Sequence, residues 1–310
     1  MSATTAASRQ PVDTRRPVVR RRGRSVGRSL WWFAAPALVA YVFVVLVPSV
    51  RGAYYAFTSW SFTSPPTFIG LDNFVTEFSS DGGSAALRTL VLAVTVVVLQ
   101  NVLGLGLALL LNGRVVGRNI LRTIIFAPMV VSGLVVGYLF KYIFGPPEIG
   151  GINTALKAFG FQQVDFLGNP RTAFLIIILT VVWQFTGSTM VIYLAGLQAI
   201  PPELDEAAAI DGAGYWKRFW HITRPLLAPA TTINLMIGLI GGLKIFDHIF
   251  AITGGGPGGQ TQTISTQLYF LFSQFSFYGR AAALGVLLTL GVGVLSFIQF
   301  SILRRQERNS

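Results

Sequence analysis

Long apolar runs, separated by short polar connections, make up most of this chain. Six of the runs reach roughly the 20 apolar residues that a helix needs to cross the hydrocarbon core of a bilayer. Polar residues interrupt them rarely: Gln100 and Asn101 lie in the second run, and Lys244 and Asp247 lie late in the fifth. The pattern predicts an all-α integral membrane protein with transmembrane spans at about 31–50, 89–111, 123–144, 173–199, 229–252 and 281–303.

One polar connection, residues 200–228, differs from the others because it is itself rich in helix-forming residues. Glu206 and the three alanines after it favour helix, and Gly212 ends that stretch. The connection is therefore predicted to form two short helices with a glycine-containing corner between them. The second helix is indicated by residues that recur at helical spacing, namely Tyr215, Trp216, Phe219 and Ile222.

Composition supports a membrane location. Of the 310 residues, 52% are hydrophobic and 12% are charged, whereas soluble domains carry roughly a quarter charged residues. The net charge is +12, but eight of the 24 Lys and Arg residues precede Leu30 and most others flank apolar runs. Such a distribution indicates membrane topology and contact with anionic lipid rather than binding to nucleic acid.

The basic residues also predict which side of the membrane each connection occupies. Residues 1–30, 112–122, 200–228 and the carboxyl terminus together hold 17 of the 24 Lys and Arg residues. Because positively charged connections tend to stay in the cytoplasm, both termini are predicted to be cytoplasmic. Residues 1–30 are predicted to be a disordered basic cytoplasmic tail. A cleaved signal peptide is the alternative, but the run 31–50 is longer than a typical signal-peptide core.

Several kinds of chemistry find no support in the sequence. There is no cysteine, and the two histidines, His221 and His248, are far apart in the chain, so we expect no metal site. No Gly-x-x-x-x-Gly-Lys-Ser/Thr loop is present to bind ATP. The few carboxylates form no convincing acid/base pair. The sequence therefore predicts no catalytic residue, and a membrane-bound enzyme is the least favoured class.

The connection 200–228 resembles the EAA loop of ABC-importer permeases. The resemblance rests on Glu206-Ala-Ala, on Gly212, and on the spacing from Gly212 to Ile222 and a closing Pro225; Arg224 departs from the pattern, which usually has Leu before the Pro. In that family the loop docks into a cytoplasmic ATPase. The resemblance thus implies that Glu206, Ala207, Ala208, Asp211 and Gly212 couple this chain to an ATPase. Asp211 has an alternative, purely structural role as the cap of the second helix.

A second motif refines the resemblance. Phe246-Asp247, then Thr253-Gly-Gly-Gly-Pro257 and Thr261, are similar to the carbohydrate-uptake branch of these importers, and within it to the maltose-type first permease. The resemblance covers Trp31 to Arg305. It implies a bacterial cytoplasmic (inner) membrane protein that works with a second homologous permease, a cytoplasmic ABC ATPase dimer that binds ATP and Mg²⁺, and an extracytoplasmic solute-binding protein.

Counting from these motifs indicates a substrate path. Gln184 and Ser188 are four residues apart on one helical face and fall at positions that line the sugar site in the family. Gly238 and Gly242 also match lining positions, or alternatively serve close helix packing. Since relatives of the maltose type have small polar residues at those two positions, the resemblance does not specify maltose. Lys244 and Asp247 are predicted either to form an ion pair or to contact solute and gate the path; Gln100 and Asn101 are predicted to make interhelical hydrogen bonds.

The sequence therefore predicts a permease subunit of an ATP-driven importer for a sugar or sugar-like polyol. An ABC importer for a non-sugar solute is one alternative, against which the Phe246-Asp247 and Thr253–Pro257 block argues. An ion-coupled secondary transporter is a second alternative; it would call for intramembrane carboxylates and inverted repeats, and Asp247 alone gives it little support. The identity of the solute does not follow from one chain.

Overall fold

The structure, a computed structural model, describes residues 27–113 and 115–309. The chain divides into two units, residues 1–50 and residues 51–310, and each is described by itself. Of the predicted tail at 1–30, residues 1–26 lie outside the described residues. In the first unit, α1 (Gly27–Tyr41) is followed by a turn of wider helix, η1 (Val42–Leu46), and by the first residues of α2 (Val47–Tyr55), whose remainder belongs to the second unit.

The described part of the second unit consists of helices joined by turns and loops. Two isolated β-bridges, Thr58 with Phe68 and Ser61 with Ser64, occur there, and the described residues contain no strand. The prediction of an all-α chain is confirmed. The elements that follow α2 are α3 (Asp72–Ser79), α4 (Asp81–Asn112), α5 (Arg118–Phe126), η2 (Ala127–Val130), α6 (Gly133–Ile143), α7 (Gly151–Ala158), α8 (Pro170–Gln198), α9 (Pro202–Ile210), α10 (Tyr215–Arg218), η3 (Phe219–Thr223), α11 (Arg224–Leu226), α12 (Ala228–Leu243), α13 (Asp247–Ile252), α14 (Ile264–Ser273) and α15 (Tyr278–Asn309).

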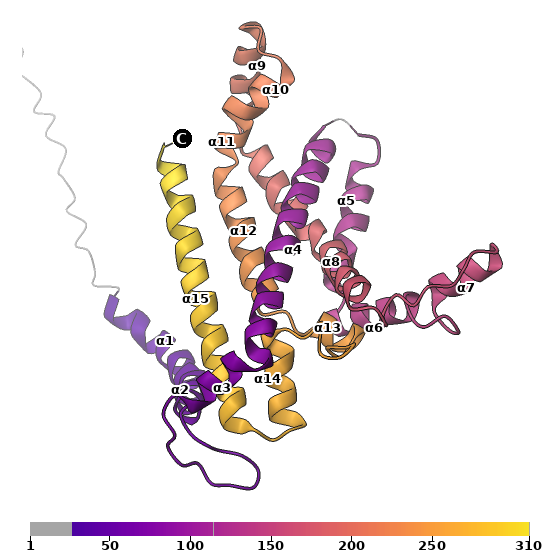
Figure 1. The fold of residues 1–310 in the computed structure, drawn as a ribbon. Helices are drawn as coiled ribbons and strands as arrows, with labels where there is room; N and C mark the ends of the chain where they lie inside the picture. Colours follow the sequence, from indigo (N-terminus) through magenta and orange to yellow (C-terminus); the bar gives the residue numbers. More distant parts are fainter. Residues whose placement is uncertain (1–26, 114, 310) are drawn as a thin grey trace, which may run out of the picture. The chain divides into compact units, whose positions relative to one another are not determined.

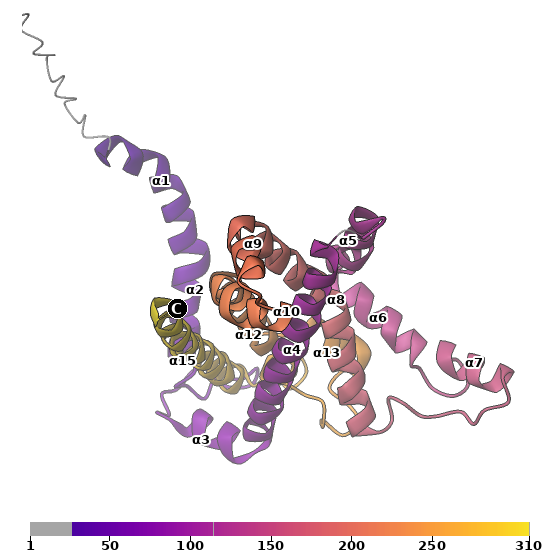
Figure 2. The ribbon, with the colours of Figure 1, turned by 90° about the horizontal axis from the view of Figure 1, so that it is seen from above.

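The core of the second unit forms where α4 packs along α8 and α12 packs against α4 (Figures 1 and 2). Many of the buried side chains between them are aliphatic, among them Leu92 and Ile177. Helices α4 and α8 approach closely at Gly104, where an added Cβ would lie 2.9 Å from Thr189 Cβ. Small residues permit this approach, as is usual between membrane helices.

Among the described residues, four helices are long and apolar enough to cross a membrane, at Phe33–Tyr55, Asp81–Asn112, Pro170–Gln198 and Tyr278–Leu303. Two bent helix pairs raise the number to six if each pair is counted as one span. The pair Arg118–Val130 and Gly133–Ile143 bends by 97°, and the pair Tyr215–Leu226 and Ala228–Leu243 bends by 65°.

The bend in the third predicted span, 123–144, follows from its proline. Pro128 has no N–H to donate, so the helix tightens into η2 and then ends. Val131 adopts an extended conformation (φ −78°, ψ 142°), and α6 starts in a new direction at Gly133. The predicted run is therefore two helices rather than one straight crossing.

The fifth predicted span, 229–252, is also divided. Helix α12 ends at Leu243 and α13 begins at Asp247, with Lys244, Ile245 and Phe246 between them. Gly241 and Gly242 precede the break, and glycine is a poor helix former. Lys244 and Asp247 consequently do not share one helix, which corrects the prediction of a single helix at 229–252.

Candidate functional site

The 200–228 connection forms two helical arms joined by a tight corner. One arm is α9; the other runs through α10, η3 and α11. Gly212 lies in the corner with φ +77°, a conformation that side chains with a Cβ rarely adopt. Glu206, Ala207, Asp211 and Gly212 are exposed, and Ala208 is half-buried. The predicted pair of short helices is confirmed, and four of the five predicted coupling residues are on the surface.

An ion pair holds the two arms together. Arg218 Nη1 in α10 lies 2.6 Å from Asp205 Oδ2 in α9. Beside this pair is a groove of about 420 Å³, which Glu206 and Tyr215 line together with residues from the ends of α4 and α8. Asp211 does not cap the second helix: Gly214 occupies that position, without a capping side chain, and Asp211 ends α9. The structural alternative for Asp211 is therefore wrong.

A cavity of about 410 Å³ lies between α4, α8, α12 and the start of α13. Most of its wall is apolar, and a few polar side chains face it, which is typical of small-molecule sites. Hydroxyl, amide, ammonium and carboxylate groups together can donate to and accept from a solute rich in hydroxyl groups. The polar and glycine residues that line it are Gln100, Ser188, Thr189, Asn234, Gly238, Gly241, Gly242, Lys244, Asp247 and His248.

The structure places five of the six predicted path residues on this cavity. Ser188, Lys244 and Asp247 line it with polar groups. Gly238 and Gly242 line it and also pack closely, since a Cβ on Gly242 would meet Ala93 Cα at 2.9 Å. Both roles suggested for the glycines are thus compatible with their positions.

Gln184 is the exception, because it does not line the cavity. Its side chain is 1% exposed, and both ends of its amide are engaged inside the protein. Nε2 donates to the carbonyl oxygen of Val131 at 2.8 Å, and Oε1 lies 2.5 Å from His248 Nε2. Gln184 thus lies behind the cavity wall, where it faces Val131 and His248, and its predicted place on the solute path stays a prediction.

Lys244 and Asp247 form no ion pair in the described part of the chain. The helix break between them removes the three-residue spacing on one helix that would bring their charges together. Both side chains are exposed to the cavity instead. Of the two roles predicted for them, pairing is therefore not observed.

Gln100 and Asn101 make the predicted interhelical hydrogen bonds. Gln100 Nε2 donates to the carbonyl oxygen of Val181 at 3.3 Å, and Tyr193 Oη donates to Asn101 Oδ1 at 2.7 Å. Gln100 also faces the cavity. Four further polar or glycine residues of the cavity were not predicted, namely Thr189, Asn234, Gly241 and His248. The only signal for His248 is its position next to Asp247.

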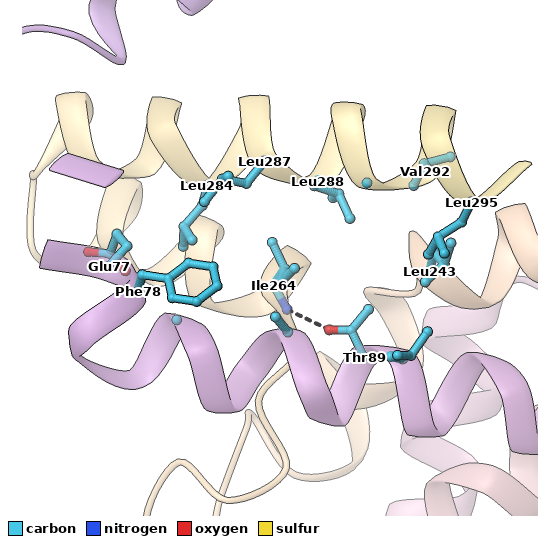
Figure 3. A pocket seen from close by; sticks show the side chains of 14 residues that line it. Glu77, Phe78, Thr89, Leu243, Ile264, Leu284, Leu287, Leu288, Val292 and Leu295 are labelled. Atoms are coloured by element: carbon cyan, nitrogen blue, oxygen red, sulfur yellow. Dashed lines mark hydrogen bonds between the residues drawn. The ribbon is translucent and has the colours of Figure 1, made fainter. Parts of the chain in front are cut away.

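A second cavity, of about 240 Å³, lies between α4 and α15 (Figure 3). Leu284, Leu287, Leu288 and Ile264 project into it from α15 and α14. The one hydrogen bond drawn there joins the amide of Ile264 to Thr89 Oγ1 at 3.0 Å and so serves the protein itself. This mostly apolar lining offers few hydrogen-bonding groups to a hydroxylated solute. The cavity beside α13 is therefore the candidate solute path. No cluster of metal-binding side chains occurs among the described residues.

Comparison with known proteins agrees with this geometry. Residues 100–309 match the family described as the binding-protein-dependent transport system inner membrane component. The chain is 35% identical, over 89% of its length and 94% of the relative, to a probable starch degradation products transport system permease protein of Thermoanaerobacterium thermosulfurigenes. It is 36% identical, over 84% of its length and 88% of the relative, to a trehalose/maltose transport system permease protein of Thermococcus litoralis.

A solved structure has the same fold. The chain superposes with a TM-score of 0.79 and 27% identity, over 90% of its length and 96% of the other chain, on a chain of a bacterial ABC transporter that imports the acidic polysaccharide alginate. The EAA motif at Glu206 is characteristic of the matched family. The chain therefore belongs to the family of binding-protein-dependent transport system inner membrane components, as a multi-pass, non-catalytic permease subunit of an ABC importer.

Proposed function

We propose that this permease imports a sugar or sugar-like polyol and that the cavity beside α13 is its share of the translocation path. The observation that carries the proposal is the cavity wall, where Ser188, Asn234 and Asp247 offer both donors and acceptors within an apolar surround. Similarity supports it, since relatives are described as permeases for starch degradation products and for trehalose and maltose. A multi-hydroxyl solute needs this mixture of polar and apolar contacts.

The 200–228 connection is the proposed site of coupling to a cytoplasmic ATPase dimer. Its two arms are joined by the tight corner at Gly212 and carry the Asp205–Arg218 ion pair, and we propose that they move together when a partner presses on them. Glu206 supplies charge at the surface, Ala207 and Ala208 allow close approach, and Gly212 permits the corner. ATP and Mg²⁺ bind to that partner rather than to this chain.

The remaining partners are a second homologous permease and an extracytoplasmic solute-binding protein. The second permease completes the path. The alginate importer has been solved in complex with a periplasmic protein bound to an alginate pentasaccharide, which supports a binding protein here. Within residues 51–310, the carboxyl end of α4, the amino end of α5, helices α9 and α10, and the carboxyl end of α15 lie at one end (Figure 1). This placement supports a shared, cytoplasmic side for those segments, and we assign the amino terminus to the same side.

Affinity purification of the chain from native membranes in mild detergent, followed by mass spectrometry, tests the proposal. We expect a second permease and a P-loop ATPase to accompany the chain, and the co-purifying or neighbouring binding protein to retain a carbohydrate. A binding protein that retains an amino acid or another non-sugar would overturn the choice of solute. A chain that purifies alone and carries solute into liposomes without ATP would instead be an ion-coupled transporter.

A further inference from the structure

We propose that Gln184 is a positioning residue of this permease: through His248 it holds the start of α13 so that Asp247 presents its carboxylate to the solute path. The proposal rests on the assignment of the cavity as that path. In this role Gln184 acts on a residue that lines the cavity and does not itself contact the solute. Three steps lead to it: the bridge that Gln184 makes, the tight contact between α6 and α13, and the position of Asp247.

The first step is the bridge. Gln184 Nε2 donates to the Val131 carbonyl at 2.8 Å, so the amide oxygen of Gln184 is the group that faces His248. That oxygen accepts the hydrogen on His248 Nε2, 2.5 Å away. Val131 belongs to the extended turn between η2 and α6, and His248 belongs to the first turn of α13. The buried side-chain amide of Gln184 on α8 thus connects the turn just before α6 with the first turn of α13.

The second step is the contact between those two helices. Helix α6 presents glycine to α13 at two positions one turn apart. An added Cβ on Gly137 would lie 2.5 Å from Ala251 Cβ, and one on Gly133 would lie 3.1 Å from both Asp247 Oδ2 and His248 Cε1. Because packed contacts of this kind transmit displacement, α6 and α13 respond together to any change at the Gln184 bridge.

The third step is the position of Asp247. It is the first residue of α13, it lines the cavity, and its side chain packs over Gly133. It follows the non-helical residues Lys244, Ile245 and Phe246. The amides of Lys244 and Ile245 donate to carbonyl oxygens in the last turn of α12, which ends at Leu243. His248, the next residue, is 3% exposed and supplies the side-chain hydrogen bond from this turn to α8. Without Gln184, the first turn of α13 loses this hydrogen bond, and the orientation of the Asp247 carboxylate toward the cavity is no longer restrained by it.

Thiol labelling measures this restraint without knowledge of the solute. The chain has no cysteine, so Asp247→Cys places a single thiol on α13, and Ser188→Cys places a single thiol on α8 in the same cavity. Each is combined with Gln184→Met, which removes both hydrogen bonds at similar size. The probe is the charged reagent MTSES, applied to the purified full-length chain together with any subunits that accompany it.

We expect Gln184→Met to change the MTSES rate at position 247 by about three- to tenfold, the effect of one or two hydrogen bonds, and to leave the rate at position 188 unchanged. Gln184→Glu keeps an acceptor for His248, so the MTSES rate at position 247 in this variant should be close to the rate measured with Gln184 in place. Equal rates at 247 with and without Gln184 would overturn the proposal. Equal changes at both positions would also overturn it, because they mean a general loosening.

His248→Phe breaks the same bond from the other side and serves as the second variant if Gln184→Met does not yield folded protein. It should produce the same selective change at position 247, and an unchanged rate there would overturn the positioning role. The labelling depends on neither ATP nor a particular solute. A chain that purifies without an ATPase would therefore refute the proposed function. The effect of Gln184 on the MTSES rate at position 247 would still be tested independently.

Discussion

Replacing Arg280 with methionine should strip a fully buried carboxylate of its partner. Glu77, in α3, is 0% exposed and receives two hydrogen bonds: from Arg280 Nε at 2.5 Å and from Gln267 Nε2 at 3.1 Å. These donors come from α15 and α14, about 200 residues later in the chain. Glu77 therefore links α3 to α15 by an ion pair and to α14 by a hydrogen bond.

The expected cost follows from the burial of Glu77. Removing one member of a buried ion pair costs about 3–5 kcal/mol, because the remaining charge stays in a poorly solvating site. Gln267 continues to donate to Glu77, and Arg280 itself is 29% exposed, so we expect Arg280→Met to fall at the lower end, about 3 kcal/mol. Glu77→Gln should cost less, about 1–3 kcal/mol, since the charge left behind can turn toward water.

Unfolding of the purified chain in detergent, followed by circular dichroism during titration with SDS, measures these losses. Asp205→Asn is the matched control because it breaks the Asp205–Arg218 pair, whose side chains are 54% and 24% exposed. An exposed pair contributes about 0–1 kcal/mol. A double variant, Glu77→Gln with Arg280→Met, should cost less than the sum of the single changes. If Arg280→Met costs no more than Asp205→Asn, the assignment of a buried ion pair is refuted.

Three further outcomes are expected. Glu206→Lys and Gly212→Leu should each abolish uptake while membrane insertion, measured by fractionation, stays normal; uptake at the unaltered level in both would refute the coupling assignment. Gly187→Ala should destabilise the chain by about 1–3 kcal/mol, since the new Cβ would lie 2.7 Å from Phe126 Cα, whereas Gly106→Ala, with nothing within 4 Å, should not; SDS titration of both variants compares them, and equal stability would contradict the packing. Asp247→Asn should lower uptake of the solute at least tenfold if its carboxylate makes a charged hydrogen bond worth about 1.5–3 kcal/mol, and uptake at the wild-type rate would remove Asp247 from the path.

The local character of most segments could be predicted from the sequence because it depends on neighbouring residues. A run of apolar side chains specifies a helix suited to a membrane regardless of what surrounds it. The two arms around Gly212 were predictable for the same reason: alanines favour helix, and glycine alone accepts a φ of +77° without strain. The break after Pro128 also has a local cause, the missing N–H of proline. The 97° angle between the two helices at this break does not follow from the local sequence.

Contacts between distant segments were decided only by the tertiary structure. Spacing placed Gln184 on the same face as Ser188, but that face meets the cavity at one level and Val131 with His248 at another. Nothing in the sequence around Glu77 predicts that it is buried or that Arg280 is its partner. The physical reason is that periodicity tells which residues share a face, whereas the partner of that face depends on how breaks such as the one after Leu243 redirect the next helix.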